Sequence, residues 1–178
     1  QISQITLDSS TCGRTKGCLF APAGCSTGNS CQMRLSYVVD GSDMVFELQG
    51  KPPSGGYMAI GFFFFDASMG NDSVSLCHDN TQMLAYNTGK STIPVNQGTK
   101  HNLEAFTATN GETHCRIRRG IIGDGNPQVF NLDSPYTIFL ANGVMHGAGV
   151  GYHLWNKWIM PHQRLDSYST ASNTASNI

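Results

Sequence analysis

The sequence contains few charged residues, no excess of either sign and no long apolar run. Charged side chains make up 13% of the 178 residues, with 11 basic and 12 acidic side chains. A protein that binds nucleic acid through its phosphates needs a basic surface, which this balance does not provide. The longest apolar stretch, residues 57–65, is far shorter than the roughly 20 residues that a bilayer-spanning helix needs. The sequence therefore predicts no nucleic-acid partner and no membrane span within these residues.

Evidence for hydrolytic chemistry is also lacking. The serine, histidine and aspartate residues form no local arrangement that singles out a nucleophile. Paired carboxylates at a strand end, as a glycosidase needs, are not evident either. We expect no self-contained active site.

Six cysteines are the first strong positive signal, at positions 12, 18, 25, 31, 77 and 115. An even number in a domain of this size is typical of an oxidising compartment, which predicts a secreted or extracellular-facing protein. Zinc is the alternative, but the spacings lack the close C-x₂₋₄-C pairs of zinc ribbons. We expect the first four cysteines to pair among themselves and Cys77 to pair with Cys115. The sequon Asn71-Asp72-Ser73 agrees with secretion and predicts a glycoprotein.

The chain carries 20 glycines and many short segments bounded by turn residues, which favours an all-β, antiparallel β-sandwich over helices. Asp40-Gly41 and Asn110-Gly111 are strong hairpin turns. They predict two hairpins, one from residues 32–39 and 44–49 and one from residues 102–109 and 112–118. Further strands are expected at residues 57–65, 73–77, 82–86, 129–132 and 136–141. No segment has a convincing helical pattern.

The domain organisation follows from these patterns. Residues 1–31 are rich in cysteine, glycine, serine and threonine, and we expect a disulfide-tied lead-in packed on the domain. Residues 32–165 form the sandwich, and residues 166–178 read as a flexible linker or tail. Because no signal peptide is present, we expect a processed or excised ectodomain. The dense basic cluster Arg116, Arg118 and Arg119 is expected on a solvated edge strand.

Four consecutive phenylalanines, at positions 62 to 65, end the most apolar strand. Side chains alternate between the two faces of a strand, so these rings cannot all face one core. Two of them must face a second layer, a cofactor or a partner. This is the best purely physical indication of a ligand pocket.

Met69 stands just beyond that strand, and a thioether beside an apolar wall suits a haem iron or a soft metal. A second strand, residues 136–141, is followed by a loop with His146 and His153. His153 is preferred because Tyr152 and Trp155 can hold its ring, whereas His146 lies in a glycine-rich run. The two segments suggest a Met/His ligand pair, although by its residue type alone Met69 is more often a core-packing residue, and a surface position is the alternative for the histidine.

The order of these segments carries a family resemblance. The cysteine-rich KGCLFAPAGCSTGNSC is followed by LSYVVDGSDMVFELQG, GGYMAIGFFFFDASMGNDSVSLC and YTIFLANG with a histidine downstream. This arrangement resembles the DOMON domain, above all the extracellular domain of ferric-chelate-reductase-type proteins. It is also similar to the cytochrome domain of cellobiose dehydrogenase.

The resemblance implies an immunoglobulin-like β-sandwich that binds haem b between Met69 and His153, with His146 as the alternative ligand. Phe63, Phe65, Tyr152 and Trp155 would line the pocket. It further implies an extracellular relay domain that passes electrons from a membrane-embedded b-type cytochrome, in the same or another chain, to an acceptor such as ferric chelates. The alternative is a haem-free DOMON module that binds a carbohydrate or a protein partner.

Overall fold

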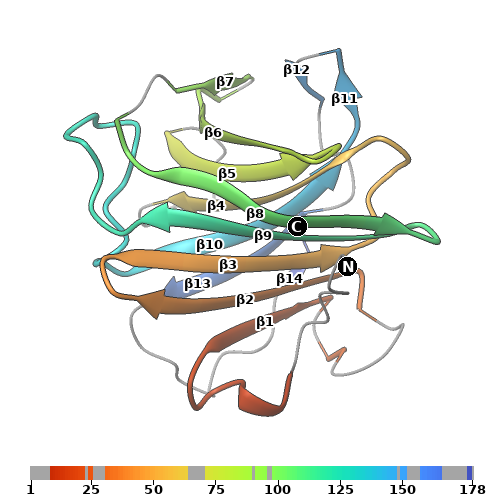
Figure 1. The fold of residues 1–178 in the computed structure, drawn as a ribbon, viewed down its shortest axis with the longest axis horizontal. Helices are drawn as coiled ribbons and strands as arrows, with labels where there is room; N and C mark the ends of the chain where they lie inside the picture. The colour runs from red at the N-terminus through yellow and green to blue at the C-terminus, as the bar shows by residue number, and fades with distance from the viewer. Residues whose placement is uncertain are drawn as a thin grey trace.

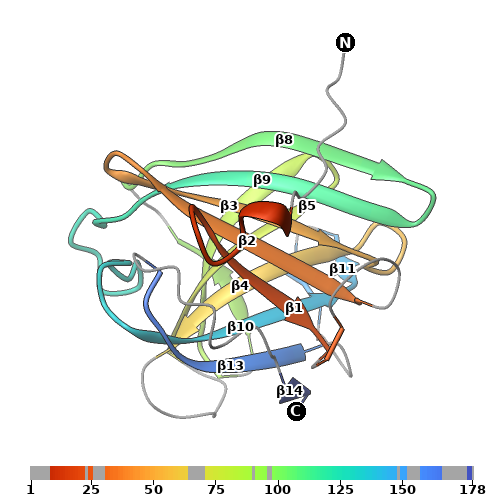
Figure 2. The ribbon, with the colours of Figure 1, turned by 90° about the horizontal axis from the view of Figure 1, so that it is seen from below.

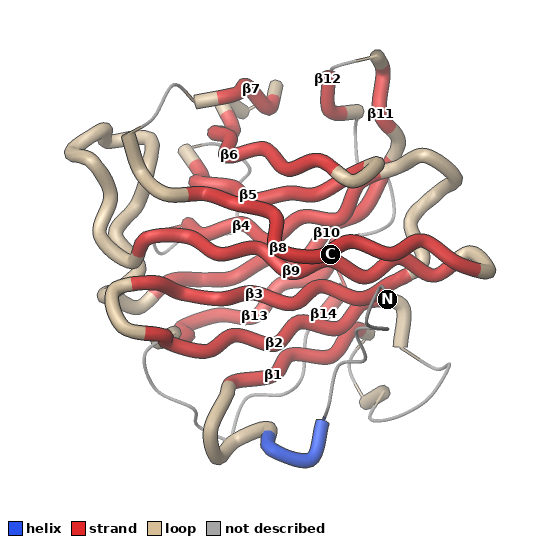
Figure 3. Tube along the Cα trace, in the orientation of Figure 1, coloured by secondary structure: helices blue, strands red, loops and turns tan. Residues whose placement is uncertain are grey.

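In the computed structural model, most of the described residues form antiparallel β-strands (Figure 1, Figure 3). A single turn of 3₁₀-helix, η1 (Ser9–Thr11), is the one helical element among the described residues. In the described part of the chain, no helix is long and apolar enough to span a membrane. The described residues are 9–22, 24–25, 31–63, 71–89, 91–95, 98–147, 149–151, 157–165 and 176–177.

Two sheets lie face to face and form a sandwich (Figure 2). The five-stranded sheet has the order β1-β2-β3-β9-β8, with bounds Gly17–Ala21, Met33–Asp40, Asp43–Gly50, Glu112–Gly120 and His101–Thr109. The seven-stranded sheet has the order β14-β13-β10-β4-β5-β6-β7. Its bounds are Ser176–Asn177, Lys157–Gln163, Tyr136–Gly143, Tyr57–Phe63, Asp72–His78, Thr81–Asn87 and Thr92–Pro94. A small hairpin joins β11 (Met145–His146) to β12 (Gly149–Val150).

The predicted hairpins are confirmed, and their turns show why the sequence specifies them. Asn110 and Gly111 both have positive φ, 55° and 76°, which is what a two-residue turn between β8 and β9 needs. Asp79 and Asn80 make the same kind of turn between β5 and β6, with φ of 44° and 58°. Asparagine, aspartate and glycine tolerate this left-handed region better than other residues.

Three sequence expectations need correction. β1 and β13 are regular strands that the pattern does not predict, and each gains its order by pairing with a buried neighbour, β2 and β10 respectively. Residues 129–132 form a loop instead of a strand. Val129 and Leu132 are buried there, at 4% and 0% exposure. Buried apolar residues in a loop give the same sequence pattern as a short strand, which explains the wrong prediction.

The basic cluster is the other correction, because β9 lies inside its sheet and not at an edge. Arg116 and Arg118 face solvent and pair with carboxylates, Arg116 with Glu47 at 2.8 Å. Arg119 points into the sandwich and is 0% exposed. Its guanidinium donates to the Phe130 carbonyl oxygen and lies 5.8 Å from the centre of the Phe62 ring. Burial lowers the pKa of Arg119 to about 10.

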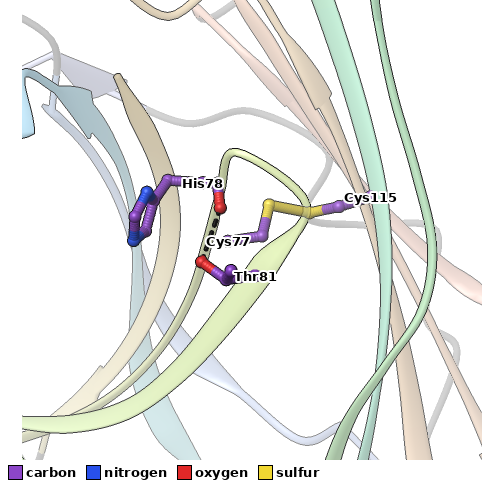
Figure 4. The surroundings of a disulfide bond; sticks show 4 residues. All are labelled: Cys77, His78, Thr81 and Cys115. Atoms are coloured by element: carbon purple, nitrogen blue, oxygen red, sulfur yellow. Dashed lines mark hydrogen bonds between the residues drawn. A yellow bond between two sulfur atoms is a disulfide. The ribbon is translucent and has the colours of Figure 1, made fainter. Parts of the chain in front are cut away.

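The core between the sheets includes Phe46 from β3 and Phe62 from β4, whose ring centroids are 5.8 Å apart. The Cys77–Cys115 disulfide crosses this core and ties β5 to β9 (Figure 4). Cys12–Cys18 and Cys25–Cys31 close short loops beside β1. The predicted division of the six cysteines is confirmed, and no thiol remains free to bind zinc.

Candidate functional site

The seven-stranded sheet is buried on both faces at its centre. One face packs against the five-stranded sheet. The opposite face is the outer face. It carries an apolar cluster that is separate from the main core: Tyr57, Ala59, Phe63, Val74, Leu76, Ala85, Phe139 and Ala141. All eight side chains are at most 3% exposed. A solvent-facing sheet would alternate apolar and polar residues, so this face is built to be covered.

Small residues occupy the middle of the outer face, where β4 pairs with β10. Ala141 of β10 lies opposite Ala59 of β4, and Phe139 lies opposite Gly61. The Phe139 ring lies over Gly61, where an added Cβ would overlap it. Phe63 and Phe139 are tilted against each other, with ring centroids 5.9 Å apart. The glycine thus receives the Phe139 ring, and the two alanines beside the rings of Phe63 and Phe139 complete an apolar floor of small and aromatic residues.

Gly61 is therefore the position that seats Phe139, which leads to a testable prediction. Gly61→Ala should lower the free energy of unfolding by about 1–3 kcal/mol, because the methyl group forces the ring out of its place. Phe139→Leu in the same chain makes room, so the double variant should lose less than the sum of the single variants. Urea unfolding of the four proteins measures this coupling. Strict additivity would contradict the packing described here.

Two charged residues interrupt the outer face and are buried with it. Lys157, at the start of β13, is 5% exposed, and its Nζ lies 5.1 Å from the centre of the Phe139 ring. Asp72, at the start of β5, is 1% exposed, and Asn87 Nδ2 donates to its Oδ2 at 3.2 Å. Burial lowers the pKa of Lys157, and the Asp72 charge opposes this shift. The apolar floor thus carries one buried amine.

The β11–β12 hairpin borders one end of the outer face, where Met145 and Val150 pack against the apolar cluster. The Tyr57 hydroxyl donates to the Gly151 carbonyl oxygen at 3.1 Å, which ties β4 to the end of this hairpin. Burial raises the pKa of Tyr57 to about 12, so the phenol is neutral at physiological pH. His146 is exposed on β11, and its ring lies beside Gly151.

The structure places part of the predicted site. Phe63 is on the outer face and Phe62 is in the core, as expected from the alternation of the phenylalanine run. Met69, Phe65, Tyr152, Trp155 and His153 lie outside the described residues.

The segments that carry these five residues are nevertheless bounded by outer-face positions. Segment 64–70 follows Phe63 and leads to Asp72, and segment 152–156 leads to Lys157. Through the strand register, Lys157 is level with Ala59, while Asp72 neighbours Phe63. Ala59 and Phe63 are four residues apart, or about 13 Å along β4. The two segments therefore leave and enter the sheet at opposite ends of the outer face.

Sequence reasoning missed most of the floor itself. The sequence places Ala59, Gly61, Phe139 and Ala141 in two predicted strands but assigns them no role in the site. A signal was present in the sequence: small residues alternate with large ones in YMAIGFF, with Ala59 and Gly61 on one face. Its partner signal in YTIFLANG, the alternate positions Phe139 and Ala141, becomes meaningful only when the two strands pair.

Other chemistry finds little support in the described residues. No group of three His, Cys, Asp or Glu side chains there could hold a metal ion. Residues 24–28 match the G-x-S-x-G pattern of hydrolases, but Cys25 is tied to Cys31. That pattern works on a strand that turns into a helix, and no α-helix occurs in the described part. A surface groove of about 310 Å³ beside the β8–β9 turn has one aromatic residue, Phe106, in its lining.

Known proteins resemble this chain in sequence and in fold. The family model of the DOMON domain matches residues 29–143, more than half of the chain. The chain belongs to the DOMON domain family. Ferric-chelate reductase 1 of Homo sapiens is 31% identical over 162 residues, which cover 85% of this chain and 26% of that protein. The DOMON domain-containing protein FRRS1L of Mus musculus is 32% identical over 144 residues, or 77% of this chain and 47% of that protein.

Among solved structures, the cytochrome domain of Myriococcum thermophilum cellobiose dehydrogenase superposes with a TM-score of 0.59 and 10% identity. The match covers 82% of this chain and 83% of that one, so the two domains share a fold. This DOMON chain spans about a quarter of the length of ferric-chelate reductase 1 and less than half of FRRS1L.

Proposed function

We propose that this DOMON domain binds haem b on the outer face of its seven-stranded sheet and transfers electrons. Met69 and His153 are the proposed axial ligands, with His146 as the alternative to His153. Phe63 and Phe139 are proposed as pocket walls, together with Phe65, Tyr152 and Trp155. The observation that carries this proposal is the second apolar cluster, a fully buried sheet face with a floor of small residues.

The outer face suits a porphyrin in its chemistry, because it is apolar and aromatic. A porphyrin is flat and apolar, and Ala59 and Ala141 place only methyl groups between such a ligand and the backbone, beside the rings of Phe63 and Phe139. The segments with the two ligands are attached at opposite ends of this floor, so a thioether and an imidazole can approach from different sides. The relatives agree with this use, since one is named a ferric-chelate reductase and another a cytochrome domain.

When bound, haem supplies a one-electron redox couple, and the protein determines its ligands, its exposure to water and the charges around it. Met69 and His153 would hold the iron through a thioether and an imidazole, a ligand pair that favours electron transfer over dioxygen chemistry. A thioether favours ferrous iron and raises the potential relative to a second histidine. The buried rings of Phe63 and Phe139 exclude water from the site. Because Tyr57 is protonated at neutral pH, it adds no negative charge.

The proposal also covers the location of the domain, its electron donor and its electron acceptor. The name ferric-chelate reductase 1 supports ferric chelates as the acceptor. As the resemblance of the sequence implies, the domain would be extracellular and would receive electrons from a membrane-embedded b-type cytochrome. Three disulfides suit the oxidising compartment that this location provides. In this proposal, residues 1–31 are a lead-in, residues 32–165 are the haem domain and residues 166–178 are a linker. The domain would be a relay and not an enzyme by itself.

The spectrum of the purified domain tests haem binding directly. We expect added haemin to produce a sharp Soret band, and dithionite reduction to resolve the α and β bands of six-coordinate haem. A spectrum that haemin does not change would overturn the proposal and favour the haem-free module that binds a carbohydrate or a protein.

Single substitutions test the ligands. Met69→Leu keeps the volume but removes the sulfur, so the reduced haem should lose its low-spin bands completely. Met83→Leu is the matched control, because Met83 also packs against the outer face and should leave the spectrum unchanged. His153→Ala and His146→Ala decide between the two histidines. Low-spin bands that survive Met69→Leu would exclude Met69 as a ligand.

A further inference from the structure

The sequon Asn71-Asp72-Ser73 has no role in the proposed electron transfer, and its asparagine has the geometry of a glycan acceptor. Asn71 is exposed directly before β5 and has a positive φ of 63°. Its backbone N–H donates to the Asn87 carbonyl oxygen at 2.8 Å, and its Oδ1 accepts from the Tyr86 hydroxyl at 2.9 Å. No described residue accepts a hydrogen bond from Nδ2, the atom that carries an N-linked glycan. The fold therefore fixes this side chain and leaves its nitrogen free.

The other two residues of the sequon are hidden in the folded protein. Asp72 and Ser73 are 1% and 0% exposed. Ser73 lies opposite Phe62 of β4 on one side and opposite Tyr86 of β6 on the other, so paired strands flank it. The enzyme that attaches N-linked glycans recognises the whole triplet, the hydroxyl of the third residue included. Once β5 is paired, that hydroxyl is out of its reach.

We infer that Asn71 carries an N-linked glycan, and that the glycan is added before β5 pairs with its neighbours. The donor is a lipid-linked oligosaccharide pyrophosphate. The Nδ2 atom attacks the anomeric carbon, a C–N bond forms, the C–O bond to the pyrophosphate breaks, and Nδ2 loses one proton as the pyrophosphate leaves. Because the reaction uses Nδ2 and keeps Oδ1, the finished protein retains the acceptor for the Tyr86 hydroxyl. The three disulfides suit the oxidising secretory pathway in which this transfer occurs.

Secretion of the whole chain from eukaryotic cells tests the site. Peptide N-glycosidase should lower the intact mass by one glycan and convert Asn71 to aspartate, which a peptide map locates. Asn71→Asp tolerates the positive φ and keeps an acceptor for Tyr86 but has no amide nitrogen, so it should carry no glycan. Asn80→Asp is the matched control, because Asn80 is exposed with φ of 58° at the other end of β5 but begins no sequon. A wild-type chain without a glycan would overturn the inference.

Transfer in vitro tests the order of the two events. One substrate is the folded, oxidised chain from bacteria, which carries no glycan, and the other is a synthetic peptide of residues 68–76, which lacks the neighbouring strands. A purified oligosaccharyltransferase with its lipid-linked donor should modify the folded chain at least about a hundredfold more slowly than the peptide, because β5 must first open. Equal rates would show that the folded protein is a substrate, and would overturn the inferred order. Both tests are independent of haem binding.

Discussion

Removal of the Cys77–Cys115 disulfide by the double substitution Cys77→Ala and Cys115→Ala is expected to lower the free energy of unfolding by about 4 kcal/mol. The bridge joins residues 38 positions apart in sequence. In the chain-entropy account, a longer loop restricts the unfolded chain more and therefore stabilises the fold more. Both cysteines are fully buried in the core between the sheets, so alanine leaves no unsatisfied polar group there.

The Cys12–Cys18 bridge is the matched control, since it closes a loop with a separation of only six residues. Its double alanine variant should lose about 2 kcal/mol by the same relation. Urea unfolding at pH 7 measures both losses. Equal losses would show that loop length does not govern the contribution of these bridges.

Acidification from pH 6.5 to pH 4.5 is expected to lower the free energy of unfolding by about 2 kcal/mol through His101 alone. His101 starts β8 and is 4% exposed. Its Nδ1 pairs with the side-chain Oε1 of Gln82, and its Nε2 lies 3.0 Å from Ser75 Oγ. Burial, with a smaller contribution from the Arg119 charge, lowers the pKa of His101 from 6.5 to about 3.

The sign follows from proton binding. Between pH 6.5 and pH 3 the unfolded chain protonates this histidine and the folded protein does not, so acid favours the unfolded state. The slope approaches about 1.4 kcal/mol per pH unit below pH 5.5, and the full contribution of His101 is present about one pH unit above its unfolded pKa of 6.5. Lowered pKa values of the Asp43, Glu47 and Asp124 carboxyl groups add a further loss, but only at pH values near and below 4.5.

His101→Asn separates this contribution from the others. The amide can still donate to Gln82 but does not titrate, so the variant should lack the loss between pH 6.5 and pH 4.5. Its absolute stability at pH 7.5 is expected to be lower, because Ser75 loses its acceptor. Urea unfolding at several pH values measures the two slopes. Parallel slopes for wild type and variant would assign the acid sensitivity to another group.

Local chemistry accounts for the parts of the fold that were predicted correctly. Asn110-Gly111 defines a hairpin because these residues adopt positive φ at little cost, whatever surrounds them. The division of the phenylalanine run follows from the pleat, which puts Phe62 in the core and Phe63 on the outer face. The split of the cysteines reflects four that are close in sequence and two that are distant.

Features that depend on distant partners were not predicted. β13 is a strand because β10 lies beside it, and residues 129–132 are a buried loop because the core covers them. Arginine is usually a surface residue, but Arg119 faces the interior. Side chains alternate along β9, so the alternation that exposes Arg118 directs Arg119 inward. Sequence periodicity does not show which face of a strand is covered.

The sequence by itself determined an all-β chain with three disulfides and a DOMON-like order of segments, because turn residues, alternation and cysteine spacing act locally. It also identified Met69 and His153 as the ligand candidates, through resemblance. Only the tertiary structure decided that the seven-stranded sheet has a second buried face, where Gly61 seats Phe139 and Lys157 is enclosed. That face is assembled from strands far apart in sequence, so its floor and its buried charge exist only after β4, β10 and β13 have paired.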